Sequence, residues 1–242
     1  MSSLTYFNKN VLITGTSRGV GFEIANYFLE NGAIVVGLSR REATIENVNY
    51  KHYSVDLSDP DSIVGCFKQK IGRDFKSLDI VINNAAVLTS QYSMIMPLKN
   101  AIDMVNINLL GVFFVSREAA KLMRKSTSGR IINIGSMASS LEPVGDSIYA
   151  ACKVGIITLA NVMAKEFASM NITCNTLAIT AIETDMLRQH TPTAQVKINE
   201  IIKNLPIPRM TKIDDILNVI DFFSSERSSY ITGQMIYLGG IN

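Results

Sequence analysis

Short apolar runs alternate with helical patterns along the whole chain, and this alternation restricts the fold more than any other feature. The apolar runs cover residues 10–14, 34–38, 53–55, 78–82, 130–134, 172–177 and 234–238. Helical spacing of apolar residues occupies the intervals at about 20–31, 59–71, 98–124, 147–169 and 214–224. Strands that are apolar on both sides and separated by helices form parallel sheets covered on both faces. The sequence therefore predicts a doubly wound α/β fold, with a mainly seven-stranded parallel sheet flanked by helices on both faces.

The chain of 242 residues fits one domain, because no tract rich in proline, glycine or serine divides it and no repeat is visible. Apolar residues make up 47% and charged residues 18%, and the net charge is +2, so a disordered chain is excluded. The 23 basic residues are scattered among 21 acidic ones, which argues against a nucleic acid partner. We expect residues 1–242 to form a single domain.

Membrane, export and metal signals are weak. The longest strongly apolar run, residues 109–115, is too short to cross a bilayer, and residues 1–9 lack the apolar core of a signal peptide. The cysteines lack motif spacing, which indicates reduced thiols in a reducing compartment. The two histidines are not joined by a cysteine or carboxylate cluster that would complete a metal site. We expect a cytoplasmic protein with no metal site and no membrane partner.

The turn after the first apolar run reads TGTSRGVG over residues 14–21. Gly15 suits the left-handed backbone of a sharp turn. Gly19 and Gly21 allow the backbone to approach a ligand and allow the following helix to pack on the strand. The start of that helix offers free N–H groups and a positive dipole end, which suit a pyrophosphate. The pattern predicts a dinucleotide site, and the alternative is a glycine-rich turn without a ligand.

The end of the second apolar run decides which nicotinamide cofactor is expected. Sites for NAD often place an acidic residue there to bind the ribose 2′-hydroxyl. Residues 37–41 read GLSRR and contain no acid. A guanidinium from Arg40 or Arg41, or from Arg18 in the glycine turn, can pair with the 2′-phosphate of NADP. The sequence therefore predicts NADP, and the alternative is that these arginines are solvated loop charges.

Three polar residues suit acid–base chemistry. Tyr149 and Lys153 are four positions apart on a predicted helix and share one face. An ammonium beside a phenol favours the phenolate and lowers the phenol pKa from about 10. Ser136, at the end of the fifth apolar run, can hydrogen bond to a substrate oxygen. Together they suit proton transfer to an oxygen while a hydride reaches the adjacent carbon, although each alone is common on a helix surface or at a helix cap.

These features resemble the short-chain dehydrogenase/reductase family over essentially the whole chain, with a pattern most like its 3-oxoacyl-[acyl-carrier-protein] reductases. The matching residues and segments are 14–21, Asp56, Asn83-Asn84-Ala85, Asn108, Ser136, Tyr149, Lys153, 175–178, 183–186 and 231–234. The resemblance implies a Rossmann fold and an NADP-dependent oxidoreductase acting on CH–OH groups. It also implies a substrate lid at about 184–209 and a homodimer or homotetramer formed through the helices at 98–124 and 147–169.

The resemblance implies roles for the catalytic set. Tyr149 would be the general acid in reduction and the base in oxidation. Lys153 would bind the nicotinamide ribose and tune Tyr149, and Ser136 would orient the substrate oxygen. Asn108 would hold a water in a proton relay through Lys153, and the alternative is a polar residue that distorts the long helix.

The implied cofactor contacts come from the glycine turn and from the ends of the following strands. Adenine would meet Asp56 and Leu57, and the nicotinamide would meet Ile182 and Thr184. The full expected set is Gly15, Ser17, Arg18, Gly19, Val20, Gly21, Ser39, Arg40, Asp56, Leu57, Asn84, Ala85, Tyr149, Lys153, Ile182 and Thr184.

The sequence departs from the family pattern near the cofactor site. Ala86 stands where glycine is usual, which is tolerable if the backbone there is not left-handed. Ile179 and Thr180 replace Pro-Gly beside the nicotinamide, and Leu238 replaces an aspartate. In the family the stretch at 179–180 shapes the wall beside the nicotinamide, so the departures bear on substrate fit and on the stiffness of the loop.

The sequence leaves three hypotheses for the function open: two classes of substrate and one role without catalysis. Thr127 and Met170 stand where the reductases carry arginines that meet an acidic carrier protein. Four basic residues remain nearby: Lys121, Arg124, Lys125 and Arg130. The first hypothesis is an acyl thioester substrate, as in these reductases, and the second is a small keto or sugar-derived metabolite. The third reading is a cofactor-sensing protein without catalysis, against which the intact catalytic set argues.

Overall fold

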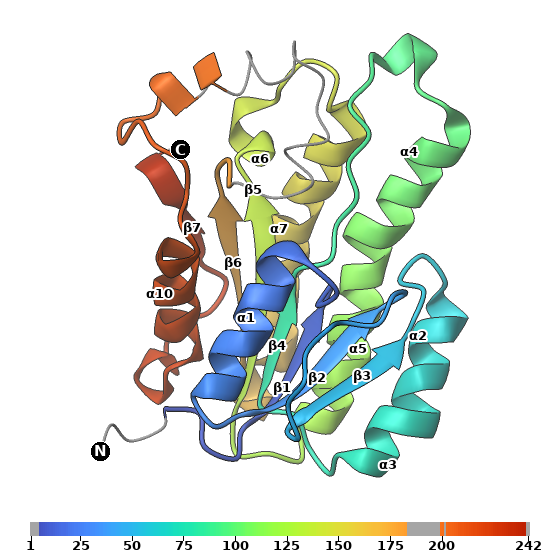
Figure 1. Ribbon diagram of the computed structural model, residues 1–242, viewed down its shortest axis with the longest axis vertical. Helices are drawn as coiled ribbons and strands as arrows, with labels where there is room; N and C mark the ends of the chain where they lie inside the picture. Colours follow the sequence, from blue (N-terminus) through green and yellow to red (C-terminus); the bar gives the residue numbers. More distant parts are fainter. Residues whose placement is uncertain (1–4, 183–198, 201, 241–242) are drawn as a thin grey trace.

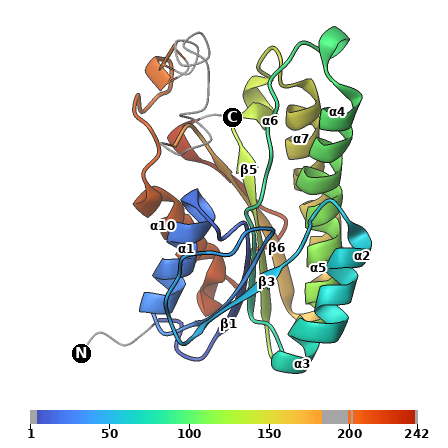
Figure 2. The same ribbon diagram turned by 45° about the vertical axis from the view of Figure 1, so that its right-hand side comes forward.

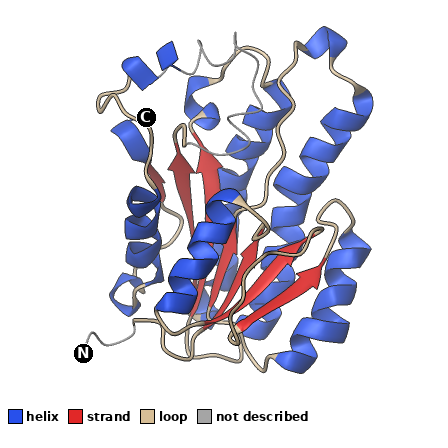
Figure 3. Cartoon of the chain, in the orientation of Figure 1, coloured by secondary structure: helices blue, strands red, loops and turns tan. Residues whose placement is uncertain are grey.

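The computed structural model describes residues 5–182, 199–200 and 202–240. Within these residues, seven parallel strands form one sheet in the order β3-β2-β1-β4-β5-β6-β7 (Figures 1 and 3). The strands are β1 Asn10–Thr14, β2 Ile34–Ser39, β3 Tyr50–Ser54, β4 Ile80–Asn83, β5 Gly129–Ser136, β6 Ile172–Ile179 and β7 Met235–Tyr237. The strand order reverses between β1 and β4, which leaves a crevice beyond their carboxyl ends. The predicted doubly wound fold is confirmed.

Helices cover both faces of this sheet (Figure 2). One face carries α1 Gly19–Glu30 and α10 Ile213–Ser224. The other face carries α2 Pro60–Cys66, its continuation α3 Gly72–Asp74, α4 Leu98–Val105, α5 Val112–Met123 and α7 Ser147–Phe167. The short helix α6, Ala138–Leu141, follows β5 and was not predicted.

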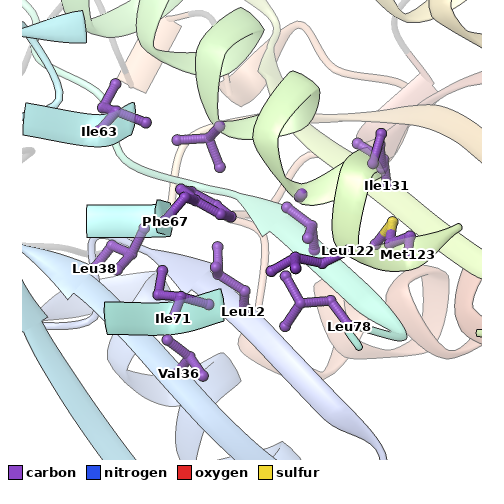
Figure 4. Packing of buried hydrophobic residues seen from close by; sticks show 14 of the residues in the cluster. Leu12, Val36, Leu38, Ile63, Phe67, Ile71, Leu78, Leu122, Met123 and Ile131 are labelled. Carbon is purple, nitrogen blue, oxygen red and sulfur yellow. The ribbon is translucent and has the colours of Figure 1, made fainter. Parts of the chain in front are cut away.

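Neighbouring residues of β1 point into two separate apolar clusters. Leu12 belongs to the cluster beneath α2, α5 and α7, whereas Val11 and Ile13 belong to the cluster beneath α1 and α10. Figure 4 shows part of the first cluster, with Phe67 and Leu12 among its buried side chains. Successive side chains of a strand face opposite sides of the sheet. The uninterrupted apolar runs of the sequence are therefore explained by a sheet that is buried on both sides.

Every strand except β1 differs from its predicted bounds: β2, β4 and β7 differ by one or two residues at an end, and the extensions of β3, β5 and β6 follow from strand pairing. The edge strand β3 begins at Tyr50 rather than at residue 53, because it pairs only with β2 and its polar residues alternate toward solvent. β5 and β6 extend beyond residues 134 and 177, because they continue to pair with each other up to Ser136 and Ile179. Ser136 therefore lies on a strand rather than after one.

The starts of the helices were predicted more accurately than the regularity of their interiors. Asp59 caps α2 by accepting a hydrogen bond from the Asp61 N–H at 3.0 Å, and Pro60 is the first helical residue, as predicted. The helices expected at 59–71 and 98–124 each contain a π-helical stretch, at Phe67–Ile71 and Asn106–Gly111. Such a stretch inserts an extra residue into a turn and often marks a functional position.

Two helical stretches, Leu98–Met123 and Ser147–Met170, are long and apolar enough by composition alone to cross a membrane. The longest strongly apolar run of the sequence, residues 109–115, is only part of the first stretch. Core helices pass the same test, and both stretches here pack on the sheet through buried residues such as Val115 and Met163. We therefore assign no membrane span to them.

Replacing the fully buried Phe223 of α10 by alanine is expected to lower the free energy of unfolding by about 3–5 kcal/mol, because it opens a cavity in the core. Urea denaturation measures the change. The matched control is Phe222→Ala in the same helix, whose side chain is 44% exposed and should cost about 1 kcal/mol or less. Equal losses in the two variants would contradict the face that α10 presents to the sheet.

Candidate active site

A cleft of about 310 Å³ lies at the carboxyl ends of the central strands and joins the glycine turn to the Tyr149 helix. Its lining is Gly15, Ser17, Arg18, Gly19, Val20, Leu38, Ser39, Arg40, Arg41, Val55, Asp56, Leu57, Asn84, Ala85, Ala86, Val87, Ile107, Ile134, Gly135, Tyr149, Lys153, Ile179 and Ile182. The residues predicted to contact the cofactor are in this set, with two exceptions. Gly21 does not line the cleft, and Thr184 lies outside the described residues.

The Asn84 side chain fastens the glycine turn to the end of β4. Its Nδ2 donates to the carbonyl oxygens of Thr14 and Gly15 at 3.0 and 3.4 Å. In return, Thr14 Oγ1 accepts from the backbone N–H groups of Asn84 and Ala85, at 3.0 Å each. Asn84 therefore holds the turn in place as well as lining the cleft, which sequence reasoning did not show.

The glycines of the turn have different tasks. Gly15 has a φ of +78°, as predicted, and Gly19 also has a left-handed φ of +63°. A Cβ atom at position 21 would overlap the carbonyl oxygen of Gly15 and the amide of Asn84. Gly21 thus permits α1 to start directly against the turn rather than touching the cleft itself.

Three guanidinium groups surround the outer end of the cleft. Arg18, Arg40 and Arg41 are exposed, and in the described part of the chain none of them forms a salt bridge. Hydrogen bonds from Ser58 lower the pKa of Asp56, and the nearby positive charge of Arg40 contributes further. Arg40 is thus close enough to Asp56 to act on the charge of its carboxylate.

Tyr149 and Lys153 line the inner end of the cleft, and Ser136 approaches Tyr149 from β5 although it is not among the lining residues. The hydroxyl groups of Ser136 and Tyr149 share a hydrogen bond. Lys153 Nζ lies 5.6 Å from the centroid of the Tyr149 ring and donates to the carbonyl oxygen of Ile134 at 2.8 Å. Two distant segments of chain, β5 and α7, therefore bring a phenol, an ammonium and a hydroxyl together.

The prediction that the Lys153 ammonium leaves the pKa of Tyr149 below 10 was wrong. Burial raises the pKa of Tyr149 to about 12, and the hydrogen bond from Ser136 opposes this only in part. Burial also lowers the pKa of Lys153 to about 8. Desolvation penalises both charged forms, and it outweighs the attraction between ammonium and phenolate that the spacing suggested.

The structure shows a task of the Asn108 side chain that the sequence did not indicate. It is fully buried in the π-helical stretch of residues 106–111, and both of its amide atoms are bonded to the backbone of Val87. Oδ1 accepts from the Val87 N–H at 2.9 Å and Nδ2 donates to the Val87 carbonyl at 2.8 Å. The side chain thus ties the distorted helix to the segment after β4, and the water relay that the resemblance implies for Asn108 stays a prediction.

Several lining residues escaped the sequence reasoning, among them Val87, Ile107 and Ile134. They are apolar residues at strand ends and on the neighbouring helix, and their composition does not separate them from core residues. Ala86 lines the cleft without a positive φ, so the departure from glycine is accommodated. Of the predicted lid at 184–209, only residues 199–200 and 202–209 are described.

Acidic and metal-binding groups are sparse around the cleft. Within residues 5–182, 199–200 and 202–240, no three histidine, cysteine, aspartate or glutamate side chains gather as a metal site would require. The cysteines Cys66, Cys152 and Cys174 are buried and unpaired.

Lys153→Met is expected to alter the pH dependence of stability. A lysine pKa of about 8 in the folded chain, against 10.5 for the free side chain, means that the unfolded chain binds more protons between these values. The contribution of the neutral Lys153 side chain to the free energy of unfolding is therefore fully present above pH 10.5, and it is lost as the pH falls through 8. The unfolding free energy of the parent relative to Lys153→Met should rise by about 2 kcal/mol from pH 8 to 10.

Urea titrations at several pH values measure this difference. The matched control is Lys165→Met, which removes an exposed charge from the same helix and should follow the parent at every pH. If Lys153→Met also follows the parent, the ammonium is not desolvated in the folded protein.

Comparison with known proteins gives one family. A sequence model described as short chain dehydrogenase matches residues 9–195. The 3-oxoacyl-[acyl-carrier-protein] reductases FabG of Salmonella typhimurium and Escherichia coli are each 32% identical over 243 residues, covering 98% of this chain and 98% of theirs. Ligand-free aldohexose dehydrogenase of Thermoplasma acidophilum matches with a TM-score of 0.88 and 26% identity, over 97% of this chain and 94% of that chain. The chain therefore belongs to the short-chain dehydrogenase family and is an oxidoreductase of that family.

Proposed function

We propose that this protein is an NADPH-dependent oxidoreductase that reduces a carbonyl to an alcohol, or catalyses the reverse. One observation carries the proposal: a single cleft joins a glycine turn, three exposed arginines and the Tyr149–Lys153 pair. A dinucleotide is long and carries phosphates near its middle, so it needs this combination of a phosphate cradle and a distant reactive end.

The residues present fit the phosphates of NADPH. The two left-handed glycines leave the turn without side chains where a pyrophosphate would lie, and the start of α1 offers its free N–H groups there. Arg18, Arg40 and Arg41 supply positive charge without an acidic residue at the end of β2, which favours a 2′-phosphate over a free hydroxyl. Bound NADPH supplies the hydride that is transferred to the substrate carbon.

Tyr149 is suited to act as the general acid in reduction. With a pKa of about 12 its phenol is protonated at neutral pH, and Ser136 is bonded to the same hydroxyl. A substrate carbonyl oxygen held by these two hydroxyls receives the proton from Tyr149 as charge develops on it. In the oxidation direction the same phenol oxygen takes the proton back.

Lys153 supports this transfer through its charge. Its ammonium is buried beside the Tyr149 ring, and at neutral pH it is protonated because its pKa is about 8. The positive charge stabilises the phenolate that remains after proton donation. We propose that the proton returns to Tyr149 through Lys153 and a water held by the backbone near Asn108.

The substrate is proposed to be a small carbonyl compound, with a 3-oxoacyl thioester as the first candidate because of the named relatives. A carrier-protein substrate is less well supported. Arg130, expected on the basic surface, is buried and donates to the carbonyl oxygens of Gly129 and Ser225. Lys121 is paired with Glu118 at 2.6 Å, which leaves Arg124 and Lys125 for docking. These contacts weaken the case for docking of an acidic carrier protein, and a small keto or sugar-derived metabolite remains the alternative substrate.

We also propose a homo-oligomer, dimer or tetramer, in the cytoplasm. Leu98 and Ile102 on α4 are 82% and 57% exposed, and Val154 and Val162 on α7 are 43% and 46% exposed. Apolar groups on two adjacent helices favour a subunit interface. The buried unpaired thiols agree with a reducing compartment.

Tyr149→Phe is expected to reduce kcat by a factor of about 10²–10⁴, because the proton donor is lost while the ring remains. The assay follows NADPH oxidation with an acyl pantetheine thioester, the same acyl group on a carrier protein, and keto-sugars. Affinity for NADPH should be retained. NADPH binding by the parent without turnover of any of these substrates would instead favour the cofactor-sensing reading.

Arg40→Ala is expected to weaken NADPH binding by a factor of about 10 or more, with little change for NADH, because only NADPH carries the 2′-phosphate that the guanidinium would pair with. Fluorescence titration of both cofactors measures this. Arg73→Ala removes an arginine on α3, away from the cleft lining, and serves as the control. Equal affinities of the parent for the two cofactors would refute the charge argument.

A further inference from the structure

The phenol of Tyr50 reaches the glycine turn from the edge of the sheet. Tyr50 is the first residue of β3, and its hydroxyl lies 2.8 Å from Thr16 Oγ1. Thr16 follows Gly15 in the turn and is fully buried, whereas its neighbours on both sides line the cleft. A side chain of the edge strand thus contacts the phosphate cradle from behind.

The contact is possible because β2, which separates β3 from β1, has a glycine at the crossing point. Gly37 pairs with Ile13 of β1 on one side and with His52 of β3 on the other. A Cβ atom at Gly37 would overlap both the Tyr50 hydroxyl and Thr16 Oγ1. The phenol therefore occupies the space that a side chain on β2 would otherwise fill.

His52 orients the phenol from the strand itself. The Tyr50 hydroxyl lies 3.1 Å from His52 Nδ1, so its two polar contacts run to the turn and to β3. Burial raises the pKa of Tyr50, so the phenol stays neutral and keeps its hydrogen. A hydroxyl offers one donor and two acceptor positions. The Tyr50 hydroxyl can therefore bond to Thr16 and His52 at the same time.

We infer that Tyr50 is a positioning residue for the phosphate-binding turn, acting through Thr16. The inference rests on the proposed dinucleotide function of the cleft. Asn84 holds the turn at Thr14 and Gly15 from the β4 side, and Tyr50 holds the next residue from the β2 side. With both contacts in place, the N–H groups of the turn are fixed before a phosphate arrives, which reduces the ordering cost of binding.

The test uses nucleotides that carry the phosphates without nicotinamide, namely ADP and 2′,5′-ADP, titrated by calorimetry into the full chain. Tyr50→Phe keeps the ring and removes the hydroxyl. We expect its affinity for both probes to fall by the same factor, about threefold to tenfold, which corresponds to one hydrogen bond. The KM for NADPH should rise by a similar factor while kcat is kept.

Tyr53→Phe is the matched control. Tyr53 lies on the same strand, but its hydroxyl is bonded to Asp74, away from the turn. Its affinity for both probes should equal that of the parent. Equal losses in Tyr50→Phe and Tyr53→Phe would show a general loosening of β3 and would overturn the inference.

Thr16→Val provides a second, independent variant. If one hydrogen bond is responsible, the double variant with Tyr50→Phe should bind ADP no more weakly than either single variant. Additive losses, or parent-like binding by Tyr50→Phe, would overturn the inference. These results are separate from those for the proposed function, because a parent that binds ADP but turns over no carbonyl, or lacks the Arg40 effect, leaves the Tyr50 comparison intact.

Discussion

The close approach of α1 to the end of β1 is the contact on which the rest of the site depends. Gly21 lies so near the carbonyl oxygen of Gly15 that no side chain fits between them. The Asn84 amide donates to the carbonyl oxygens of Thr14 and Gly15. Backbone groups buried at such a point require partners. Asn84, directly after β4, supplies such a partner. The glycine turn is therefore held against the end of β4, at the point where the strand order reverses and the cleft opens.

The sequence predicted the elements whose signals are local. The glycine turn, the Asp59–Pro60 helix start and the pairing of Tyr149 with Lys153 on one helix face all depend on spacing within a few residues. Ser136 also reached its predicted partners, because the carboxyl end of a parallel strand is fixed by the fold. By contrast, β3 was placed too late, since an edge strand pairs on one side only and tolerates the polar sequence that begins at Tyr50.

Two other expectations failed because spacing does not reveal burial. The pKa of Tyr149 rises rather than falls, because desolvation outweighs the nearby ammonium. Arg130 was expected on a basic surface but is buried and donates to the carbonyl oxygens of Gly129 and Ser225. The bonds of the Asn108 side chain to Val87 were also not visible in the sequence, and its water relay stays a prediction. Lys153 shows the same cost in another form, since a buried ammonium disfavours the folded state at neutral pH. Such local costs are common where a chain retains a reactive group at the expense of stability.

The crossing of Tyr50 over Gly37 has a consequence for how this chain can change over evolutionary time. Any side chain that appears at position 37 meets both the Tyr50 phenol and the Thr16 hydroxyl, so a substitution there requires changes at both of these positions. Loss of the phenol in turn leaves Thr16 with an unused hydroxyl inside the protein, where an apolar residue would serve better. The three positions therefore constrain one another, because a change at one of them alters which side chains fit at the other two.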